Sequence, residues 1–133
     1  MNLTEKLNRR YASKMMNGTS IDTQKAENIL EAIRLAPTSL GLQPFTVFVI
    51  KSQEMKEKIF NLAATGQPQI PTCSHLLVFA ANRSITSEML DEYFELFKSA
   101  RTLPKEKSEG FRKMLNYLLM RSDADNFNWA ARQ

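Results

Sequence analysis

Three cations near the N-terminus have the types and spacing to bind a phosphate group. Arg9, Arg10 and Lys14 lie within six consecutive residues, and no acidic residue separates them. A guanidinium offers a planar pair of donors and an ammonium a compact point charge, and both suit phosphate. Cations at this place also complement the dipole at the C-terminus of a helix. Spacing alone therefore leaves two interpretations open, a phosphate site and an ordinary helix end.

A second polar segment follows about two dozen residues later, at Pro37–Pro44. Thr38 and Ser39 supply hydroxyls, Gly41 supplies backbone freedom and Gln43 an amide. The segment lies between a predicted helix and a predicted strand, where its donors could meet the polar edge of a ligand. Such residues are also ordinary turn formers, so an unspecialised turn is the alternative.

In their order and spacing the two segments resemble the nitroreductase family, FMN-dependent enzymes that reduce substrates with electrons from NADH or NADPH. By this resemblance, Arg10, Tyr11, Ala12 and Lys14 contact the phosphate and ribityl chain of FMN. Many family members carry Ser where this chain has Ala12, which leaves only the backbone to bond at that position.

The resemblance extends to two further segments. Pro37, Thr38 and Ser39 match the loop that, in the family, comes from the partner subunit and covers the flavin. It implies a homodimer with a shared site. Gln67 and Gln69 match the place where an amide side chain contacts the edge of the isoalloxazine ring.

The resemblance implies an oxidoreductase that transfers hydride from NADH or NADPH, through flavin N5, to a small-molecule acceptor such as a nitro compound or a quinone. The protein would supply orientation and charge, so we name binding residues and no catalytic side chain. Two alternatives remain: a truncated or split family member without activity on its own, and a basic helical adaptor.

The remaining motifs do not indicate a metal site, a nucleophile or a glycine-rich phosphate loop. Cys73 and His75 are two residues apart, but no further ligand or orienting group is spaced to complete a metal site or a nucleophile. We therefore predict no metal, and a buried strand beginning near Ser74. Glycine-rich phosphate loops are absent from the sequence, which has four glycines.

Composition predicts a globular protein. The 133 residues are 43% apolar and 24% charged, with a net charge of +4 and one cysteine. These values favour a single domain, a cytoplasmic location and no membrane segment. Most of the remaining cations alternate with acids, as in Lys105–Glu109, which argues against nucleic acid as a partner.

The hydrophobic pattern predicts an α+β fold. Strands are expected at Phe45–Ile50 and His75–Ala81, both covered on two faces, with a loop at Thr65–Ser74 between the helices and strands. The predicted helices are 3–9, 23–36, 53–64, 87–100, one from about Ser108, and one that opens after a cap within Asp123–Asn126.

Two strands do not make a complete sheet. The resemblance implies a central mixed or antiparallel sheet flanked by helices, and it stops at Gln133, in what resembles the opening of the family's long central helix. We therefore expect residues 1–133 to form one nitroreductase-like domain that lacks the family's C-terminal part.

Overall fold

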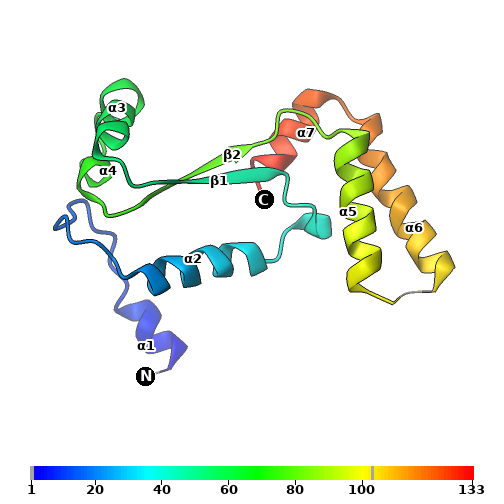
Figure 1. The fold of residues 1–133 in the computed structure, drawn as a ribbon, viewed down its shortest axis with the longest axis horizontal. Helices are drawn as coiled ribbons and strands as arrows, with labels where there is room; N and C mark the ends of the chain where they lie inside the picture. Colours follow the sequence, from blue (N-terminus) through cyan, green and yellow to red (C-terminus); the bar gives the residue numbers. More distant parts are fainter. Residues whose placement is uncertain (1, 103) are drawn as a thin grey trace. The chain divides into compact units, whose positions relative to one another are not determined.

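A computed structural model describes residues 2–102 and 104–133. These form helices and one two-stranded sheet, which is the α+β arrangement predicted from the sequence (Figure 1). The residues group into two compact units. One comprises Met1–Glu31 with Phe48–Val78, and the other comprises Ala32–Val47 with Phe79–Gln133.

The elements follow one another along the chain, and the long connection between α1 and α2 spans residues 9–22. The strands are β1 (Phe45–Ile50) and β2 (Leu76–Ala81). The helices are α1 (Leu3–Asn8), α2 (Thr23–Leu35), α3 (Gln53–Ala63), α4 (Gln69–Thr72), α5 (Ser87–Ala100), α6 (Lys105–Asn116) and α7 (Asp123–Ala130), with 3-10 turns η1 (Ser39–Gly41) and η2 (Tyr117–Met120).

Short polar side chains cap α2 and α3, which begin where the sequence predicted. Asp22 accepts a hydrogen bond from the backbone nitrogen of Gln24 at 2.9 Å, at the start of α2. Ser52 accepts from the nitrogen of Met55 at 3.3 Å and starts α3. Such caps satisfy N–H groups that have no partner inside the helix.

The two strands pair in antiparallel fashion, since the residue that follows β2 bonds to the residue that precedes β1. The backbone nitrogen of Asn82 donates to the carbonyl oxygen of Pro44 at 2.9 Å. Close to this end the rings of Phe45 and Phe79 lie 5.8 Å apart, centroid to centroid. The predicted strands are thus confirmed, although β2 begins at Leu76 rather than at His75.

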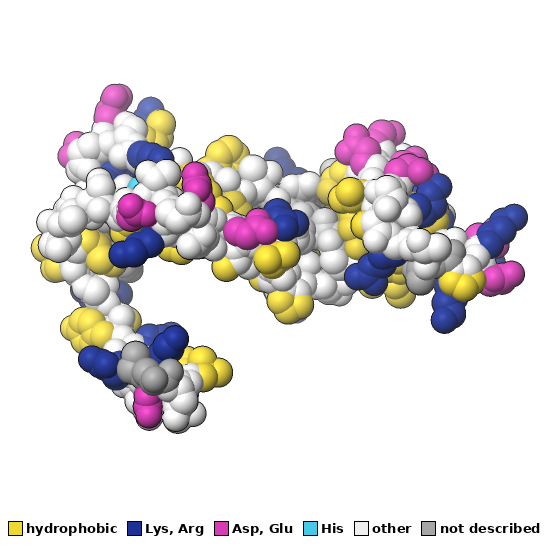
Figure 2. Space-filling model, turned by 60° about the horizontal axis from the view of Figure 1, so that its bottom comes forward, with side chains coloured by type: hydrophobic (Ala, Val, Ile, Leu, Met, Phe, Trp, Pro, Cys, Tyr) yellow, Lys and Arg dark blue, Asp and Glu magenta, His cyan; other side chains and the backbone are white. Residues whose placement is uncertain are grey.

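The prediction that both faces of each strand are covered was wrong for the described residues. Phe48 is 53% exposed and Phe79 is 56% exposed. An apolar run indicates that a strand can be covered on both faces, but it does not supply the covering element. Figure 2 shows apolar side chains at the surface among the charged ones.

The predicted loop at 65–74 contains a short helix, α4, although the segment carries Pro68 and Pro71. Pro68 occupies the N-cap and Pro71 the third position of the helix. Proline is tolerated there because N–H groups of the first turn have no partner within the helix. The correction matters because Gln69 becomes the first helical residue.

Two helix starts also differ from the sequence prediction. α6 begins at Lys105 after Pro104, three residues before the predicted start at Ser108. α7 is capped by Ser122, which accepts from the nitrogen of Asp125 at 3.2 Å, and Asp123–Asn126 lie inside the helix. The N-cap of α6 is thus Pro104, whose ring fixes φ, and the N-cap of α7 is Ser122, whose side chain caps the helix. Within the predicted break at 101–107, Leu103 lies outside the described residues.

A small apolar core lies in the second unit. In Figure 1, α5 and α6 run side by side as a helical hairpin, and Arg112 of α6 bonds to the carbonyl oxygen of Leu90 at 3.0 Å and to the carboxylate of Asp91. The cluster of buried apolar side chains here comprises Leu42, Ile85, Leu90, Leu115 and Leu118. Leu42 brings the end of the second polar segment into this core.

Candidate functional site

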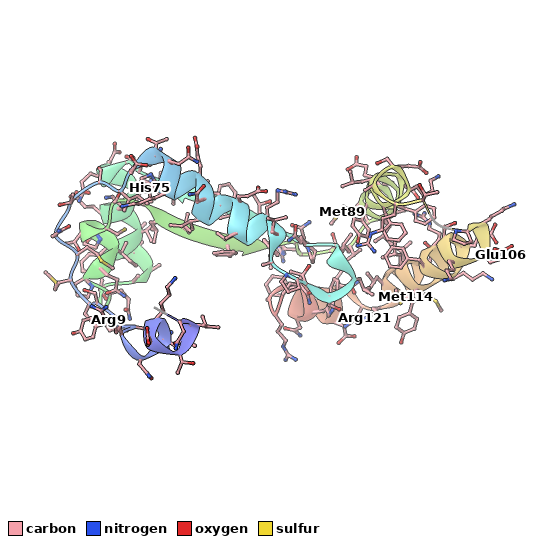
Figure 3. All side chains as sticks on the ribbon, turned by 90° about the horizontal axis from the view of Figure 1, so that it is seen from below. Arg9, His75, Met89, Glu106, Met114 and Arg121 are labelled. Atoms are coloured by element: carbon pink, nitrogen blue, oxygen red, sulfur yellow. The ribbon has the colours of Figure 1, made fainter. Side chains whose placement is uncertain are left out.

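The basic segment begins where α1 ends. Arg9 is the C-cap of that helix, and the segment Arg10–Lys14 continues without regular structure (Figure 3). Within the described ranges, no ion pair involves Arg10 or Lys14, and both residues are exposed. The position at a helix end agrees with the capping interpretation, while the exposed charges stay available to an anion.

The chain after this segment is tied to the α4 region. The backbone nitrogen of Met16 donates to Thr72 Oγ1 at 3.2 Å, and that of Ile21 donates to Ser74 Oγ at 3.0 Å. Gly18 lies between them with φ 74°, a conformation that glycine adopts at little cost. The fold therefore places the basic segment and the Gln67–Gln69 stretch in the same unit.

The two glutamines meet each other. Gln69 Nε2 donates to Gln67 Oε1 at 2.7 Å, which fixes the orientation of both amides. Gln69 Oε1 is buried and has no hydrogen-bond partner among the described residues. A buried acceptor left unpaired costs about 1–3 kcal/mol, so this atom suits a donor that arrives with a ligand.

The loop at residues 37–43 lies in the second unit, and a distant residue holds it. The backbone nitrogen of Ser39 donates to Gln133 Oε1 at 2.6 Å, across 94 positions of sequence. Gln133 in turn donates from Nε2 to the carbonyl oxygen of Trp129 at 3.1 Å. Thr38 Oγ1 is buried, again with no partner in the described part of the chain.

This 37–43 loop contains three left-handed residues. Leu40 has φ 60°, Gly41 φ 70° and Gln43 φ 47°. For residues other than glycine, such a conformation costs about 1–2 kcal/mol and must be enforced by its surroundings. Gln43 contributes to that enforcement, because its Nε2 donates to the carbonyl oxygen of Arg34 at the end of α2, at 3.1 Å.

Tyr93 of α5 supplies the second constraint. Its hydroxyl donates to the carbonyl oxygen of Leu40 at 2.6 Å. A Cβ atom built at Gly41 would lie 2.7 Å from the same hydroxyl oxygen, so the two segments approach as closely as glycine allows. Burial raises the pKa of the Tyr93 phenol above its usual value, against a smaller opposing effect of Arg101.

The loop borders a hollow of about 440 Å³ that has an aromatic wall. The rings of Phe97 and Phe111 stack at 4.3 Å, and Tyr93 lies edge-on to Phe111 at 6.2 Å. The hollow is lined by Arg34, Ala36, Pro37, Thr38, Leu40, Gly41, Gln43, Tyr93, Phe97, Arg101 and Phe111. Planar groups pack well against such a wall.

The predicted site residues thus fall into two sets. Arg10, Tyr11, Ala12 and Lys14 share a unit with Gln67 and Gln69, whereas Pro37, Thr38 and Ser39 belong to the other. The sequence did not single out Tyr93 or Gln133. Tyr93 fits the apolar face of its helix. Its hydroxyl was the signal that could have distinguished it from the other residues of that face, because a buried hydroxyl needs a hydrogen-bond partner.

Two features of the described residues bear on other functions. These residues contain no cluster of three or more His, Cys, Asp or Glu side chains that could hold a metal ion. None of the helices described is both long enough and apolar enough to span a bilayer.

Comparison with known proteins identifies the family of this chain. The model of the nitroreductase family matches residues 7–130, so the chain belongs to that family, as the two polar segments had indicated. That range includes both the basic segment and the 37–43 loop.

Individual relatives agree with this assignment. The chain is 29% identical over 134 aligned residues to the Bacillus subtilis protein YfkO, named as an NAD(P)H nitroreductase, covering 95% of this chain and 61% of YfkO. It is 30% identical over 108 residues to the major NAD(P)H-flavin oxidoreductase of Aliivibrio fischeri, covering 77% and 50% respectively.

Solved structures show the same fold. The nitroreductase ydfN of Bacillus subtilis superposes with a TM-score of 0.79 at 21% identity, covering 97% of this chain and 62% of that one. An Exiguobacterium sibiricum nitroreductase, solved in complex with FMN, gives 0.72 at 20% identity, covering 98% and 65%. The chain therefore spans between half and two thirds of the length of these relatives.

Proposed function

We propose that this protein is an FMN-dependent oxidoreductase that uses NADH or NADPH to reduce nitro compounds, quinones or similar small acceptors. The observation that carries the proposal is the family match, because residues 7–130 include both polar segments. The names of two relatives, an NAD(P)H nitroreductase and an NAD(P)H-flavin oxidoreductase, support the same class of reaction.

The chemistry of the donor set fits FMN. The phosphate needs cations, and Arg10 and Lys14 are exposed and engaged in no ion pair within residues 2–102 and 104–133. The polar edge of the ring system needs a hydrogen-bond acceptor. Gln69 Oε1 is buried and accepts no hydrogen bond from the described residues. When bound, FMN would supply the redox chemistry, accepting hydride from the nicotinamide and delivering it to the acceptor.

The chain's own residues would bind FMN and orient it. Arg10 and Lys14 hold the phosphate, with Tyr11 and the backbone of Ala12 beside the ribityl chain. Gln67 orients Gln69, whose free oxygen accepts from the ring edge. No side chain is required to move a proton during hydride transfer, so we assign no catalytic residue.

Pro37, Thr38 and Ser39 would cover the flavin of a second subunit. We propose a homodimer with two shared sites, in which the hydroxyls of Thr38 and Ser39 face the ligand. Thr38 Oγ1 has no partner in the described chain, which supports a role in binding. We further propose a cytoplasmic location, without a nucleic-acid or membrane partner, in keeping with the single cysteine.

The test is purification of the natural protein without added cofactor, followed by intact mass, visible absorption and oxidation of NADH and NADPH. We expect bound or readily bound FMN, and turnover with a nitro or quinone acceptor. A colourless protein that gains no flavin on titration and oxidises neither nucleotide would contradict the proposal. It would favour the alternative, a family member without activity on its own.

A further inference from the structure

We infer that Tyr93 and Gln133 are positioning residues that hold the 37–43 loop in its binding conformation. Each makes one hydrogen bond to the backbone of two adjacent loop residues, Leu40 and Ser39 respectively. The inference rests on the proposed function, since it concerns the loop that would cover FMN. It assigns roles to two residues outside both polar segments.

The two bonds fix neighbouring residues of the loop from two different positions later in the sequence. Gln133 Oε1 accepts from the Ser39 nitrogen at 2.6 Å, and the Tyr93 hydroxyl donates to the Leu40 carbonyl oxygen at 2.6 Å. The Ser39–Leu40 dipeptide therefore has both its first donor and its last acceptor engaged by side chains. Neither group can then rotate to serve a ligand.

What remains for a ligand is the pair of hydroxyls. Thr38 Oγ1 is buried without a partner among residues 2–102 and 104–133, and Ser39 is exposed. Because the backbone is already paired, binding would not have to order the loop first. Pre-ordering of this kind raises affinity by removing an entropy cost from the binding step.

The loop would not keep its conformation unaided. Leu40 is held at φ 60°, where a residue with a Cβ is strained, and its carbonyl oxygen is the atom that Tyr93 binds. Gly41 follows at φ 70°, with space for Tyr93 only because it lacks a Cβ. Tyr93 thus contacts the strained form of the loop at a place where a Cβ at position 41 would displace its hydroxyl.

The first experiment removes the hydroxyl alone. In the full-length protein, Tyr93→Phe should accelerate amide hydrogen exchange in residues 38–43 and raise the Kd for FMN, each by about three- to ten-fold, the usual range for one hydrogen bond. Tyr117→Phe is the matched control, because Tyr117 is 63% exposed and loses only its hydroxyl in the same substitution. It should alter neither quantity.

A second pair of variants tests Gln133. Gln133→Ala removes the acceptor for the Ser39 nitrogen and should produce the same two effects. Gln133→Glu keeps an acceptor oxygen but loses the donor to the Trp129 carbonyl oxygen, and it should restore part of the exchange protection. Slower amide exchange in Gln133→Glu than in Gln133→Ala distinguishes the hydrogen bond from simple packing.

The close approach at Gly41 adds an independent check. Gly41→Ala should disturb the loop more in the natural background than in Tyr93→Phe, because the clash at 2.7 Å involves the hydroxyl oxygen, whereas the next ring atom is 3.8 Å away. The two substitutions should therefore combine non-additively in hydrogen exchange.

Failure of this inference differs from failure of the proposed function. Unchanged exchange in residues 38–43 of Tyr93→Phe overturns the positioning role, whatever the flavin affinity. Faster exchange with an unchanged FMN Kd overturns the link to flavin but leaves the function standing. A natural protein that binds no FMN rejects the function and the link together, while exchange still reports whether Tyr93 holds the loop.

Discussion

The ammonium nitrogen of Lys56 lies 2.6 Å from the carbonyl oxygen of Cys73, and only 5% of the lysine is exposed. The bond joins α3 to the residue that ends α4, just before β2. A buried ammonium is tolerated only when it is hydrogen-bonded, so this carbonyl group is part of what lets α3 pack where it does. Gln53 supports the same connection by donating to the carbonyl oxygen of Pro71 at 3.1 Å.

Replacing Lys56 should therefore destabilise the protein. Lys56→Met keeps most of the apolar stem but removes the donor, and we expect a loss of about 1.5–3 kcal/mol in the free energy of unfolding, as for a hydrogen bond to a charged group. Chemical denaturation measures it. Lys58→Met, at an exposed position of the same helix, is the control and should change stability by no more than about 0.5 kcal/mol. Equal effects from the two variants would mean that the Cys73 bond contributes nothing.

Arg10→Ala should weaken FMN binding by about 1.5–3 kcal/mol, because it removes a charge-assisted hydrogen bond to the phosphate. Flavin fluorescence during titration gives the affinity. Lys6→Ala removes a nearby positive charge from α1 and should change affinity far less. An unaltered Kd for Arg10→Ala would remove this residue from the proposed site.

Mixing two defective proteins should test the shared site. If residues 37–39 of one subunit cover the flavin of the other, an Arg10→Ala variant and a Ser39→Ala variant form a hybrid dimer with one intact site. We expect partial recovery of flavin binding after subunit exchange, while each variant alone stays impaired. Hybrid dimers that form, as shown by differential tagging, yet recover nothing would place the loop in its own subunit's site.

Leu90→Ala should lower the free energy of unfolding by about 2–5 kcal/mol, the range for emptying a buried leucine site. Leu90 is fully buried in the core of the second unit, whereas Leu96 on the same helix is 64% exposed. Leu96→Ala therefore makes a matched control, with an expected change within about 0.5 kcal/mol. Thermal or chemical denaturation compares the two, and a similar loss from both would contradict the packing described for α5.

The Tyr93 phenol should ionise at a higher pH than an ordinary tyrosine, because burial raises its pKa. The folded state thus holds this proton more tightly than the unfolded state. Its contribution to stability is complete below the unfolded pKa and is lost as the pH rises through the folded value. Subtracting the absorbance titration of Tyr93→Phe from that of the natural protein isolates this group. A difference curve within the ordinary tyrosine range would disprove the burial described here.

Local features of the fold could be predicted because they depend on neighbours in sequence. Asp22 and Ser52 each cap a helix within three residues, and the apolar runs at β1 and β2 form strands. α4 was missed because its prolines read as loop signals, although both occupy positions of the helix where a backbone N–H has no partner.

The binding segments of the candidate site stay a prediction from the sequence, and the residues that hold the 37–43 loop were not predicted at all. Residue types indicated phosphate and ring contacts, but the residues that shape the 37–43 loop are distant in sequence: Tyr93 is 53 positions from Leu40, and Gln133 is 94 from Ser39. No periodicity connects such pairs. They follow from the packing of α5 and α7, which the pattern of apolar residues does not specify in detail.

The bond between Ser39 and Gln133 has a consequence for the order in which the chain acquires its structure during synthesis. A ribosome delivers Pro37–Gln43 well before Gln133, and loops of such length close slowly relative to helices. The strained turn at Leu40 therefore lacks the bond from Ser39 to Gln133 until the residues after α7 have emerged. Translation speed between the codons for Gln43 and Gln133, rather than the local sequence, then determines how long this part of the nascent chain lacks the bond.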